Sequence, residues 1–463
     1  MGRRRRRGYV FDDRWVVVRG LGEGGQGAAY RVRESKTGSD DWVLKELHDH
    51  SPSDRRGRSK RLARFEREIA ALERVRSPHV PQVTRPPREG RMYFVTPYVG
   101  KNLHDVPDAA DPVALLERFR GIVVAVRDAH AGGVVHRDIK PNNVTVNDEG
   151  KSFLVDFGIC AADDDEPSGG LTSAMEALGN RNFTAPECEA GSEDACGPPS
   201  DVYSLGKLLY WMGTAGRDRR VMSREDFNPD ALSFADPYAR QYVRVLIDRS
   251  VRANPGSRWS VTELLEGVDW ALAKLKEHSG IREEGRTVLA DNFGPNDTCY
   301  ESGSRSAKTG HGDPPKDYDL AHSYFVAESA VLERVDIRVA RQAGSGRMEV
   351  TLIEGGDEVP SDEPEDVVEQ WFRELTAPRQ ALEVLYLPSS TGATLGPQET
   401  YWLRLVACDN DSRVEWMSGA IELMPWVSRF ADRPRGSAWT PRVSESGPPF
   451  AFRVLARPLD ANG

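Results

Sequence analysis

The stretch HRDIKPNN, residues 136–143, determines the fold and function expected of this 463-residue chain. It places Asp138 and Asn143 five residues apart, so that a carboxylate and a carboxamide can face one phosphoryl group from a single loop. A carboxylate can act as a general base toward a hydroxyl, and an amide oxygen is a suitable ligand for magnesium. Lys140 can offset negative charge that develops on the transferred group. The loop therefore predicts phosphoryl transfer.

A second acidic residue follows this loop after a turn. The turn NDEG, residues 147–150, leads into a short apolar strand that ends at Asp156, in the tripeptide DFG. An aspartate supplies the hard oxygen ligand that magnesium prefers. Asn143 and Asp156, from adjacent strands of one hairpin, are expected to hold a metal ion, Mg²⁺ or alternatively Mn²⁺.

A glycine-rich segment lies near the N-terminus of the chain. In LGEGGQGAAY, residues 21–30, the residues Gly22, Gly24 and Gly27 stand between two expected strands. A strand-turn-strand context favours a loop whose backbone N–H groups cover phosphates, because glycine lets the backbone approach closely. A merely flexible hairpin is the alternative for a single motif of this kind.

Lys45 lies in an otherwise apolar expected strand, residues 42–47. A buried, unpaired ammonium group is costly, so Lys45 needs an anionic partner. Glu68 is the expected counter-ion, with nucleotide phosphates as a second one; a lysine that extends from an edge strand into solvent is the alternative. Glu68 lies on an expected helix whose apolar positions repeat every three or four residues: Leu62, Phe65, Ile69 and Leu72.

In their order and spacing these motifs resemble a eukaryotic-type serine/threonine protein kinase of the bacterial kind, over about residues 8–278. The resemblance implies an α+β bilobal protein kinase fold that uses ATP and Mg²⁺. It makes Asp138 the catalytic base and assigns the metal to Asn143 and Asp156. It also implies that Lys45, paired with Glu68, anchors the α- and β-phosphates.

The same resemblance places the adenine and the substrate. Backbone groups at residues 97–99, which include Tyr98 and Val99, would hold adenine beside a gatekeeper at Thr96. Lys140, two residues after the catalytic aspartate, matches the serine/threonine pattern rather than the tyrosine one. Protein substrates with Ser or Thr acceptors are therefore expected.

Three further positions match structural residues of the family. Glu187 in APE is expected to pair with Arg258, and Asp201 to brace the catalytic loop. Small-molecule phosphotransferases of the aminoglycoside type are disfavoured, because they usually lack the arginine of HRD, here Arg137, and the APE segment. A pseudokinase-type binding scaffold is the alternative function.

The kinase is expected to autophosphorylate, and phosphorylation in the segment between DFG and APE is expected to raise its activity. Thr172 and Ser173 are the favoured sites, with Ser168 next, because a phosphorylated residue would give Arg137 a dianionic partner. The acidic run at residues 163–166 is the alternative partner for Arg137.

The chain is expected to contain a basic tail, a kinase domain, a linker and a second domain. The tail covers residues 1–8, the kinase domain 9–278 (N-lobe 9–100, C-lobe 101–278), the linker 279–286 and the second domain 287–463.

The second domain is expected to be an all-β sandwich. Short alternating runs predict it, and residues 291–294, 317–325 and 400–405 weakly resemble jelly-roll-like modules of bacterial surface proteins. Sensing, targeting or partner binding is expected of it, with a protein or carbohydrate ligand. Four tryptophans would offer a stacking platform for a sugar, or would instead form the core: Trp402, Trp416, Trp426 and Trp439.

Composition restricts the class of protein. A formal charge of -10 argues against a nucleic-acid binder, and no stretch is long and apolar enough for a membrane span. The five cysteines, odd in number and widely spaced, predict reduced thiols in a cytoplasmic protein.

Overall fold

The chain forms two compact units, residues Met1–Leu272 and Ala273–Gly463. The computed structural model describes residues 5–23, 27–36, 38, 41–47, 55–84, 92–107, 111–157, 182–189, 196–214, 231–234, 236–284, 286–291, 307–309, 318–326, 329–343, 346–355, 360–361, 363–376, 382–396, 399–408, 413–416, 430–434, 440–442 and 452–458.

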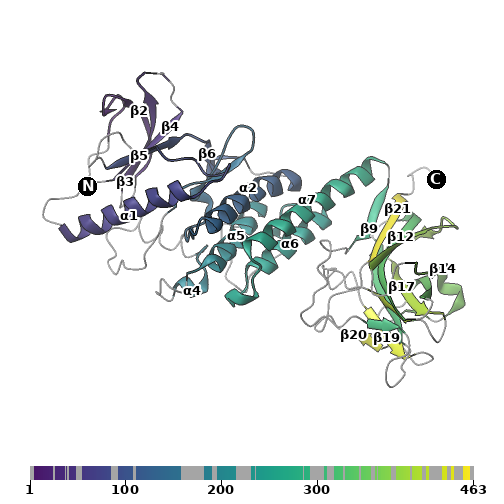
Figure 1. Ribbon diagram of the computed structural model, residues 1–463. Coiled ribbons are helices and arrows are strands. Elements are labelled where there is room, and N and C mark those ends of the chain that lie inside the picture. The colour runs from purple at the N-terminus through teal and green to yellow at the C-terminus, as the bar shows by residue number, and fades with distance from the viewer. Residues whose placement is uncertain are drawn as a thin grey trace. The chain divides into compact units, whose positions relative to one another are not determined.

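The first unit begins with a five-stranded antiparallel sheet whose strands follow one another in sequence order (Figure 1). Alternation of apolar and polar residues buries Trp15, Tyr30 and Leu44 on one face of this sheet. The three strands predicted near the N-terminus are all present. The strands are β1 (Val10–Phe11), β2 (Trp15–Glu23), β3 (Gly27–Glu34), β4 (Trp42–Leu47) and β5 (Tyr93–Pro97).

Helix α1 (Arg55–Arg74) supplies Glu68 to the site. Its apolar stripe packs from Phe65 onward, where the Phe65 ring lies 5.4 Å from that of Phe94 on β5. Leu62, predicted to share this stripe, is 40% exposed. The prediction was wrong for Leu62 because the buried face of α1 starts one turn later.

The N-terminal tail is held against the sheet at Arg5. The guanidinium of Arg5 lies 2.7 Å from a carboxylate oxygen of Glu46 on β4, and its backbone N–H donates to the Tyr30 hydroxyl. The amide of Gly8 donates to the carbonyl of Val17. Residues 5–8 of the predicted tail are therefore part of the first unit.

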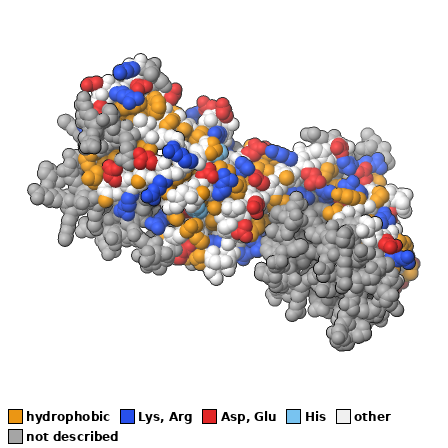
Figure 2. Space-filling view, viewed as in Figure 1, with side chains coloured by type: hydrophobic (Ala, Val, Ile, Leu, Met, Phe, Trp, Pro, Cys, Tyr) orange, Lys and Arg blue, Asp and Glu red, His pale blue; other side chains and the backbone are white. Residues whose placement is uncertain are grey.

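Helices form the remainder of the first unit, together with a three-stranded sheet (Figure 1). Asp111 and Asp236 cap α2 and α6, and each is followed by proline at the first helical position. The elements are β6 (Lys101–Asn102), α2 (Pro112–Ala131), β7 (Val144–Val146), β8 (Ser152–Leu154), α4 (Pro186–Glu189), α5 (Pro198–Gly213), α6 (Pro237–Ser250) and the first part of α7 (Val261–Glu283), with 3-10 turns at Leu103–Asp105, Pro141–Asn143 and Pro255–Ser257. The residues of α7 from Ala273 onward belong to the second unit. On the face of the molecule seen in Figure 2, acidic and basic side chains of the described residues are interspersed.

Helix α7 extends beyond the predicted end of the kinase domain. It runs to Glu283, so residues 279–283 of the predicted linker are helical. The physical reason is that buried positions continue along the helix at Leu275, His278 and Ile281. None of the helices among the described residues is long and apolar enough to cross a membrane.

The second unit contains two antiparallel sheets. In one, β12 (Ala330–Ala343) pairs with β15 (Leu382–Pro388), β16 (Thr394–Leu395), β18 (Arg413–Trp416) and β21 (Phe452–Pro458); β10 (Ala307–Thr309) and β9 (Thr287–Asp291) are the outer strands. The other has the order β14 (Val367–Glu374), β13 (Arg347–Glu354), β17 (Glu399–Ala407), β11 (Tyr318–Val326), β19 (Phe430–Pro434) and β20 (Thr440–Arg442). A 3-10 turn at Pro364–Asp366 leads into β14.

One hydrophobic core is shared by these two sheets. Alternate residues of β12, such as Val335 and Ile337, and alternate residues of β13 and β17, such as Val350 and Leu403, are buried in one hydrophobic cluster. Trp402 is also fully buried, which excludes it from an exposed stacking platform. The structure describes β18 but not the side chain of Trp416, and Trp426 and Trp439 lie outside the described residues.

Candidate active site

Asp201 of helix α5 anchors the loop at residues 136–143. Its carboxylate accepts the backbone N–H groups of His136 at 2.8 Å and Arg137 at 2.7 Å, and the Nε2 atom of His130 lies 2.8 Å away. Arg137 has a positive φ of 64°, a strained conformation that these bonds hold in place. This anchorage fixes the residue that follows, Asp138.

Asp138, Lys140 and Asn143 are brought together as the loop motif predicted. The ammonium of Lys140 lies 2.8 Å from Oδ2 of Asp138. The Nδ2 group of Asn143 donates to that same oxygen at 2.9 Å and to the carbonyl of Asp138 at 2.7 Å. Because Nδ2 is used in these bonds, Oδ1 of Asn143 is the atom suited to a metal.

Lys45, Glu68 and Asp156 form a charged cluster from three separate elements. The Nζ atom of Lys45 lies 2.7 Å from Oε1 of Glu68 and 2.6 Å from Oδ1 of Asp156. The Glu68 side chain is 9% exposed and that of Asp156 is 51% exposed. The predicted pairing of Lys45 with Glu68 is therefore present in the structure.

The pKa values in this cluster follow its geometry. Burial lowers the pKa of Lys45, but attraction to Asp156 and Glu68 outweighs this and raises it. The partial burial of Asp156 raises its pKa, and attraction to Lys45 more than reverses the effect, so the net pKa lies below its usual range. The net pKa of Glu68 is raised, first by burial. Lys45 is therefore charged and Asp156 is ionised.

Asp156 lies beside the loop at residues 136–143. The backbone N–H of Val155 donates to the carbonyl of Asn143 at 2.9 Å. The buried ring of Phe157 lies 4.7 Å from that of His136. These contacts bring Asn143 and Asp156 to one place although twelve residues intervene, and both offer oxygen donors.

The predicted adenine-binding strand lies next to Lys45. Thr96 is 8% exposed and is in register with Val43 across β4 and β5. The N–H of Tyr98 donates to the carbonyl of Asp41 at 2.7 Å. Its amide is therefore already used within the first unit, which leaves Val99 as the backbone donor suited to a base.

In the glycine-rich hairpin, the close approach of β4 requires glycine at position 27. A Cβ atom on Gly27 would lie 2.2 Å from the carbonyl oxygen of Glu46. Gly22, opposite Ala29 in the β2–β3 pair, has open space around it. Gly24 lies outside the described residues.

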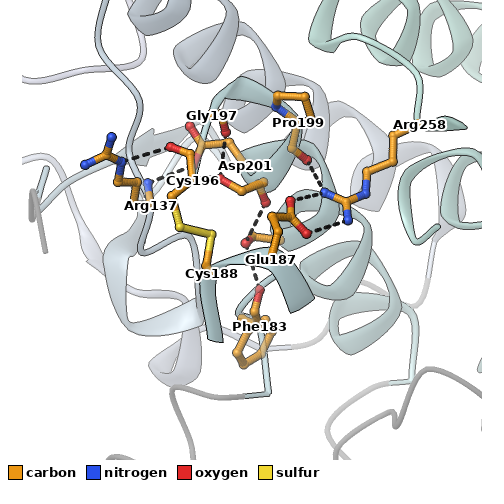
Figure 3. Close-up of a disulfide and its surroundings, with 11 residues drawn as sticks. Arg137, Phe183, Glu187, Cys188, Cys196, Gly197, Pro199, Asp201 and Arg258 are labelled. Atoms are coloured by element: carbon orange, nitrogen blue, oxygen red, sulfur yellow. Dashed lines mark hydrogen bonds and ion pairs between the residues drawn. A yellow bond between two sulfur atoms is a disulfide. The ribbon is translucent and has the colours of Figure 1, made fainter. Parts of the chain in front are cut away.

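A buried ion pair joins the APE segment to Arg258, the residue after the 3-10 turn at Pro255–Ser257. Both Nη atoms of Arg258 donate to the Glu187 carboxylate, at 2.5 and 2.8 Å, and the Arg258 side chain is fully buried. Ser204 of α5 also donates to the carbonyl of Phe183 at 2.7 Å. The predicted pairing is present, and Figure 3 shows it beside Asp201.

Cys188 and Cys196 form a disulfide in this region (Figure 3). The prediction of reduced thiols is wrong for this pair, because the fold brings their Cα atoms to 5.3 Å. Their separation of only eight residues was the available sequence signal. Cys408 is exposed, and Cys160 and Cys299 lie outside the described residues.

Arg137 has a partner that the sequence did not suggest. Its Nε group donates to the carbonyl of Cys196 at 3.1 Å. The predicted phosphorylation sites Thr172, Ser173 and Ser168 and the acidic run at 163–166 lie outside the described residues. Their relation to Arg137 remains a prediction.

Residues 15–268 match the family described as protein kinase domain. Because this match covers more than half of the chain, the chain belongs to the protein kinase family. It is 33% identical over 291 residues to the DNA damage-responsive serine/threonine-protein kinase RqkA of Deinococcus radiodurans, covering 58% of this chain and 40% of that protein.

Two other relatives are similar over comparable stretches. The probable serine/threonine-protein kinase PknB of Lactococcus lactis subsp. lactis is 28% identical over 208 residues, covering 44% of this chain and 32% of the relative. The putative CBL-interacting protein kinase 13 of Oryza sativa subsp. japonica is 30% identical over 314 residues, covering 65% and 57%. In all three cases the chain spans less than two thirds of the relative's length.

Proposed function

We propose that this chain is an ATP-dependent serine/threonine protein kinase that transfers the γ-phosphate of ATP to protein hydroxyls and also autophosphorylates. The observation that carries the proposal is the juxtaposition of two sets of residues. Lys45, Glu68 and Asp156 form one set, and the bond from Val155 to Asn143 joins it to the catalytic loop. Phosphate anchoring and a general base thus meet at one site.

Asp138 is the general base of the proposed reaction. Its Oδ2 atom is held by Asn143 and Lys140, so the carboxylate has a fixed direction before a substrate arrives. It accepts the proton of the acceptor hydroxyl as that oxygen attacks phosphorus. Lys140 lies close enough to offset charge on the transferred group.

Lys45 is proposed to hold the α- and β-phosphates. Its ammonium group remains charged because Glu68 and Asp156 raise its pKa. Glu68 keeps Lys45 in place through a 2.7 Å ion pair when Asp156 binds magnesium instead of Lys45. A buried lysine without Glu68 would lose this orientation.

Asn143 and Asp156 suit a magnesium ion bound with the nucleotide. Both supply hard oxygen donors, and the lowered pKa of Asp156 keeps its carboxylate ionised. Magnesium, when bound, neutralises phosphate charge. Manganese has the same donor preference and is the proposed substitute.

A serine or threonine acceptor is supported by Lys140 at its position two residues after Asp138 and by the printed names of two bacterial relatives. A cytoplasmic location is part of the proposal, since the reaction draws on intracellular ATP. The adenine site is proposed at Thr96, Tyr98 and Val99, and the glycines Gly22, Gly24 and Gly27 are proposed to cover the phosphates.

For the second unit we propose an all-β sandwich of jelly-roll-like type that senses, targets or binds a partner. Its two antiparallel sheets and their shared core support this. Immobilised residues 273–463 and a matched kinase unit, exposed to a glycan array and to cell lysate, test the role. Specific retention by the second unit is expected, and no retention above the kinase unit would contradict it.

Incubation of the purified chain with radiolabelled ATP, Mg²⁺ and a generic protein substrate tests the proposed activity. Label on phosphoserine or phosphothreonine is expected. Nucleotide binding without any transfer, to the substrate or to the chain itself, would instead indicate a pseudokinase-type scaffold.

A further inference from the structure

The disulfide between Cys188 and Cys196 lies next to Arg137, which precedes the proposed catalytic base. We infer that Cys188 and Cys196 form a thiol–disulfide modification site that sets the position of Arg137 and thereby the rate of phosphotransfer. The inference rests on the proposed kinase function. A dithiol reductant is the chemical class of its co-reactant.

Cys188 is fixed at its end of the bridge. It lies in α4 directly after Glu187, whose carboxylate is held by the two Nη atoms of the fully buried Arg258. Figure 3 shows the sulfur–sulfur bond reaching from α4 to the segment that precedes α5. Through this bond, the buried Glu187–Arg258 pair also restrains Cys196.

Cys196 presents its carbonyl to Arg137. It stands directly before Gly197, the N-cap of α5, and its carbonyl oxygen accepts Nε of Arg137 at 3.1 Å. The backbone N–H of Arg137 is held separately by Asp201 at 2.7 Å. Among the described residues, the guanidinium of Arg137 thus has the carbonyl of Cys196 as its hydrogen-bond acceptor. The Nη atoms of Arg137 point away from Cys196 in Figure 3.

The bridge is accessible to reductant. Cys188 and Cys196 are both partly exposed, unlike the Arg258 side chain behind them. Disulfides in compartments that hold thiols reduced are usually transient and serve catalysis or redox sensing. A partly exposed bridge beside a catalytic loop has the properties of a labile one.

The redox step is an exchange reaction. The S–S bond between Cys188 and Cys196 breaks, two thiols form, and the dithiol supplies two electrons and two protons while it becomes a cyclic disulfide. The link from Cys196 to the Glu187–Arg258 pair is then lost. The Cys196 carbonyl gains freedom, Arg137 loses a fixed acceptor, and the backbone at Asp138 becomes less restrained.

Reduction should therefore lower kcat on the order of tenfold, a typical size for coupling through a positioning contact. The KM for ATP should stay unchanged, because Lys45, Glu68 and Asp156 do not contact the bridge. Reoxidation should restore kcat. This division between kcat and KM distinguishes positioning from general loss of structure.

The test equilibrates the full chain with defined ratios of reduced and oxidised dithiothreitol, a dithiol that becomes a cyclic disulfide. Alkylation with mass spectrometry measures the fraction of bridged Cys188, and radiolabelled ATP measures phosphotransfer. We expect both curves to have the same midpoint. Cys188→Ser and Cys196→Ser should both fix kcat at the reduced level at every ratio, and Cys196→Ser retains the backbone carbonyl, so that only the bridge is removed.

Cys408→Ser is the matched control, since Cys408 is an exposed cysteine of the second unit, and it should titrate like the wild type. Constant phosphotransfer while the bridge titrates would overturn the inference. If nucleotide binds but no transfer occurs at any ratio, the proposed function fails. Hydrogen exchange of residues 136–143 then decides the inference: faster exchange on reduction supports it, and unchanged exchange overturns it.

Discussion

The ammonium group of Lys45 lies 2.6 Å from a carboxylate oxygen of Asp156, although the two residues are 111 positions apart in the chain. Lys45 belongs to strand β4 of the N-terminal sheet, and Asp156 follows β8 near the catalytic loop. The pair therefore joins the sheet to the loop before nucleotide is bound. On binding of ATP and metal, phosphate oxygens would replace Asp156 as partners of Lys45, and the metal ion would replace Lys45 as the partner of Asp156.

Replacing Lys45 by methionine should reduce phosphotransfer by on the order of 10²-fold or more, because a charge aimed at the phosphates is lost. It also leaves the buried carboxylate of Glu68 without its 2.7 Å partner. Steady-state kinetics with radiolabelled ATP measures the effect. Lys36→Met, at an exposed lysine in the turn after β3, is the control and should behave as wild type; equal activity of the two variants would remove Lys45 from the site.

Replacing Glu187 by alanine should lower the free energy of unfolding by about 3–5 kcal/mol, because the fully buried guanidinium of Arg258 loses its counter-ion. The matched comparison is the exposed pair Arg120–Asp269, whose side chains are 42% and 47% exposed. There, Asp269→Asn should cost less than about 1 kcal/mol. Urea unfolding of both variants measures the difference, and similar costs would contradict the account of the buried pair.

Acid should destabilise the second unit through Glu369. Burial raises the pKa of Glu369, but hydrogen bonds from Ser389, Ser390 and Thr391 outweigh it, and the net pKa is below the usual value. Backbone and side-chain donors of Ser390 reach one oxygen at 2.5 and 2.9 Å. A carboxylate with a lowered folded pKa adds stability above its unfolded pKa, and that stability is lost as pH falls through the folded pKa.

Hydrogen exchange of peptides from β14 and β15 between pH 6 and pH 3 checks this prediction, after correction for the intrinsic exchange rate. In the wild type, protection should fall below about pH 4.3, the ordinary value for glutamate. Glu369→Gln should remove most of that dependence and lower protection at pH 6. The exposed Glu374→Gln is the control; a Glu369 variant with the wild-type pH profile would exclude Glu369 as the cause.

A fragment of residues 273–463 should be more stable than one of residues 285–463. The longer fragment retains Glu277 of α7, which pairs with Arg453 of β21, and Arg453 also contacts the fully buried Asp336 at 2.8 Å. Without Glu277, Arg453 keeps only one of these carboxylates. Thermal unfolding followed by circular dichroism should show the higher midpoint for the longer fragment. In that fragment, Glu277→Gln should reproduce part of the loss, and equal midpoints would show that α7 adds nothing.

The charged residues of the candidate active site were predictable because their chemistry leaves few alternatives. A lysine inside an apolar strand needs a carboxylate, and the stripe of α1 offered Glu68. Asp138 and Asn143 lie in one loop, so their spacing alone placed them together. For Glu187 and Arg258, the family pattern rather than local spacing supplied the pairing.

Features set by tertiary contact were not predictable in the same way. Cys188 and Cys196 are brought together by the start of α5 and the end of the APE segment, and an odd cysteine count argued against a bridge. The end of α7 was placed too early because the polar residues of 279–286 concealed the buried Ile281. Arg5 is held by Glu46 through a long-range contact that no local pattern reveals.

Phosphotransfer by Asp138→Asn is the most direct measurement of the central claim. Asparagine keeps the shape of the side chain and its contact with Asn143 but cannot accept a proton, so kcat should fall by about 10²- to 10⁴-fold. The affinity for Mg²⁺–ATP, measured by calorimetry, should change little, because Lys45 and Asp156 are intact. Unchanged turnover in Asp138→Asn would contradict the assignment of this chain's chemistry.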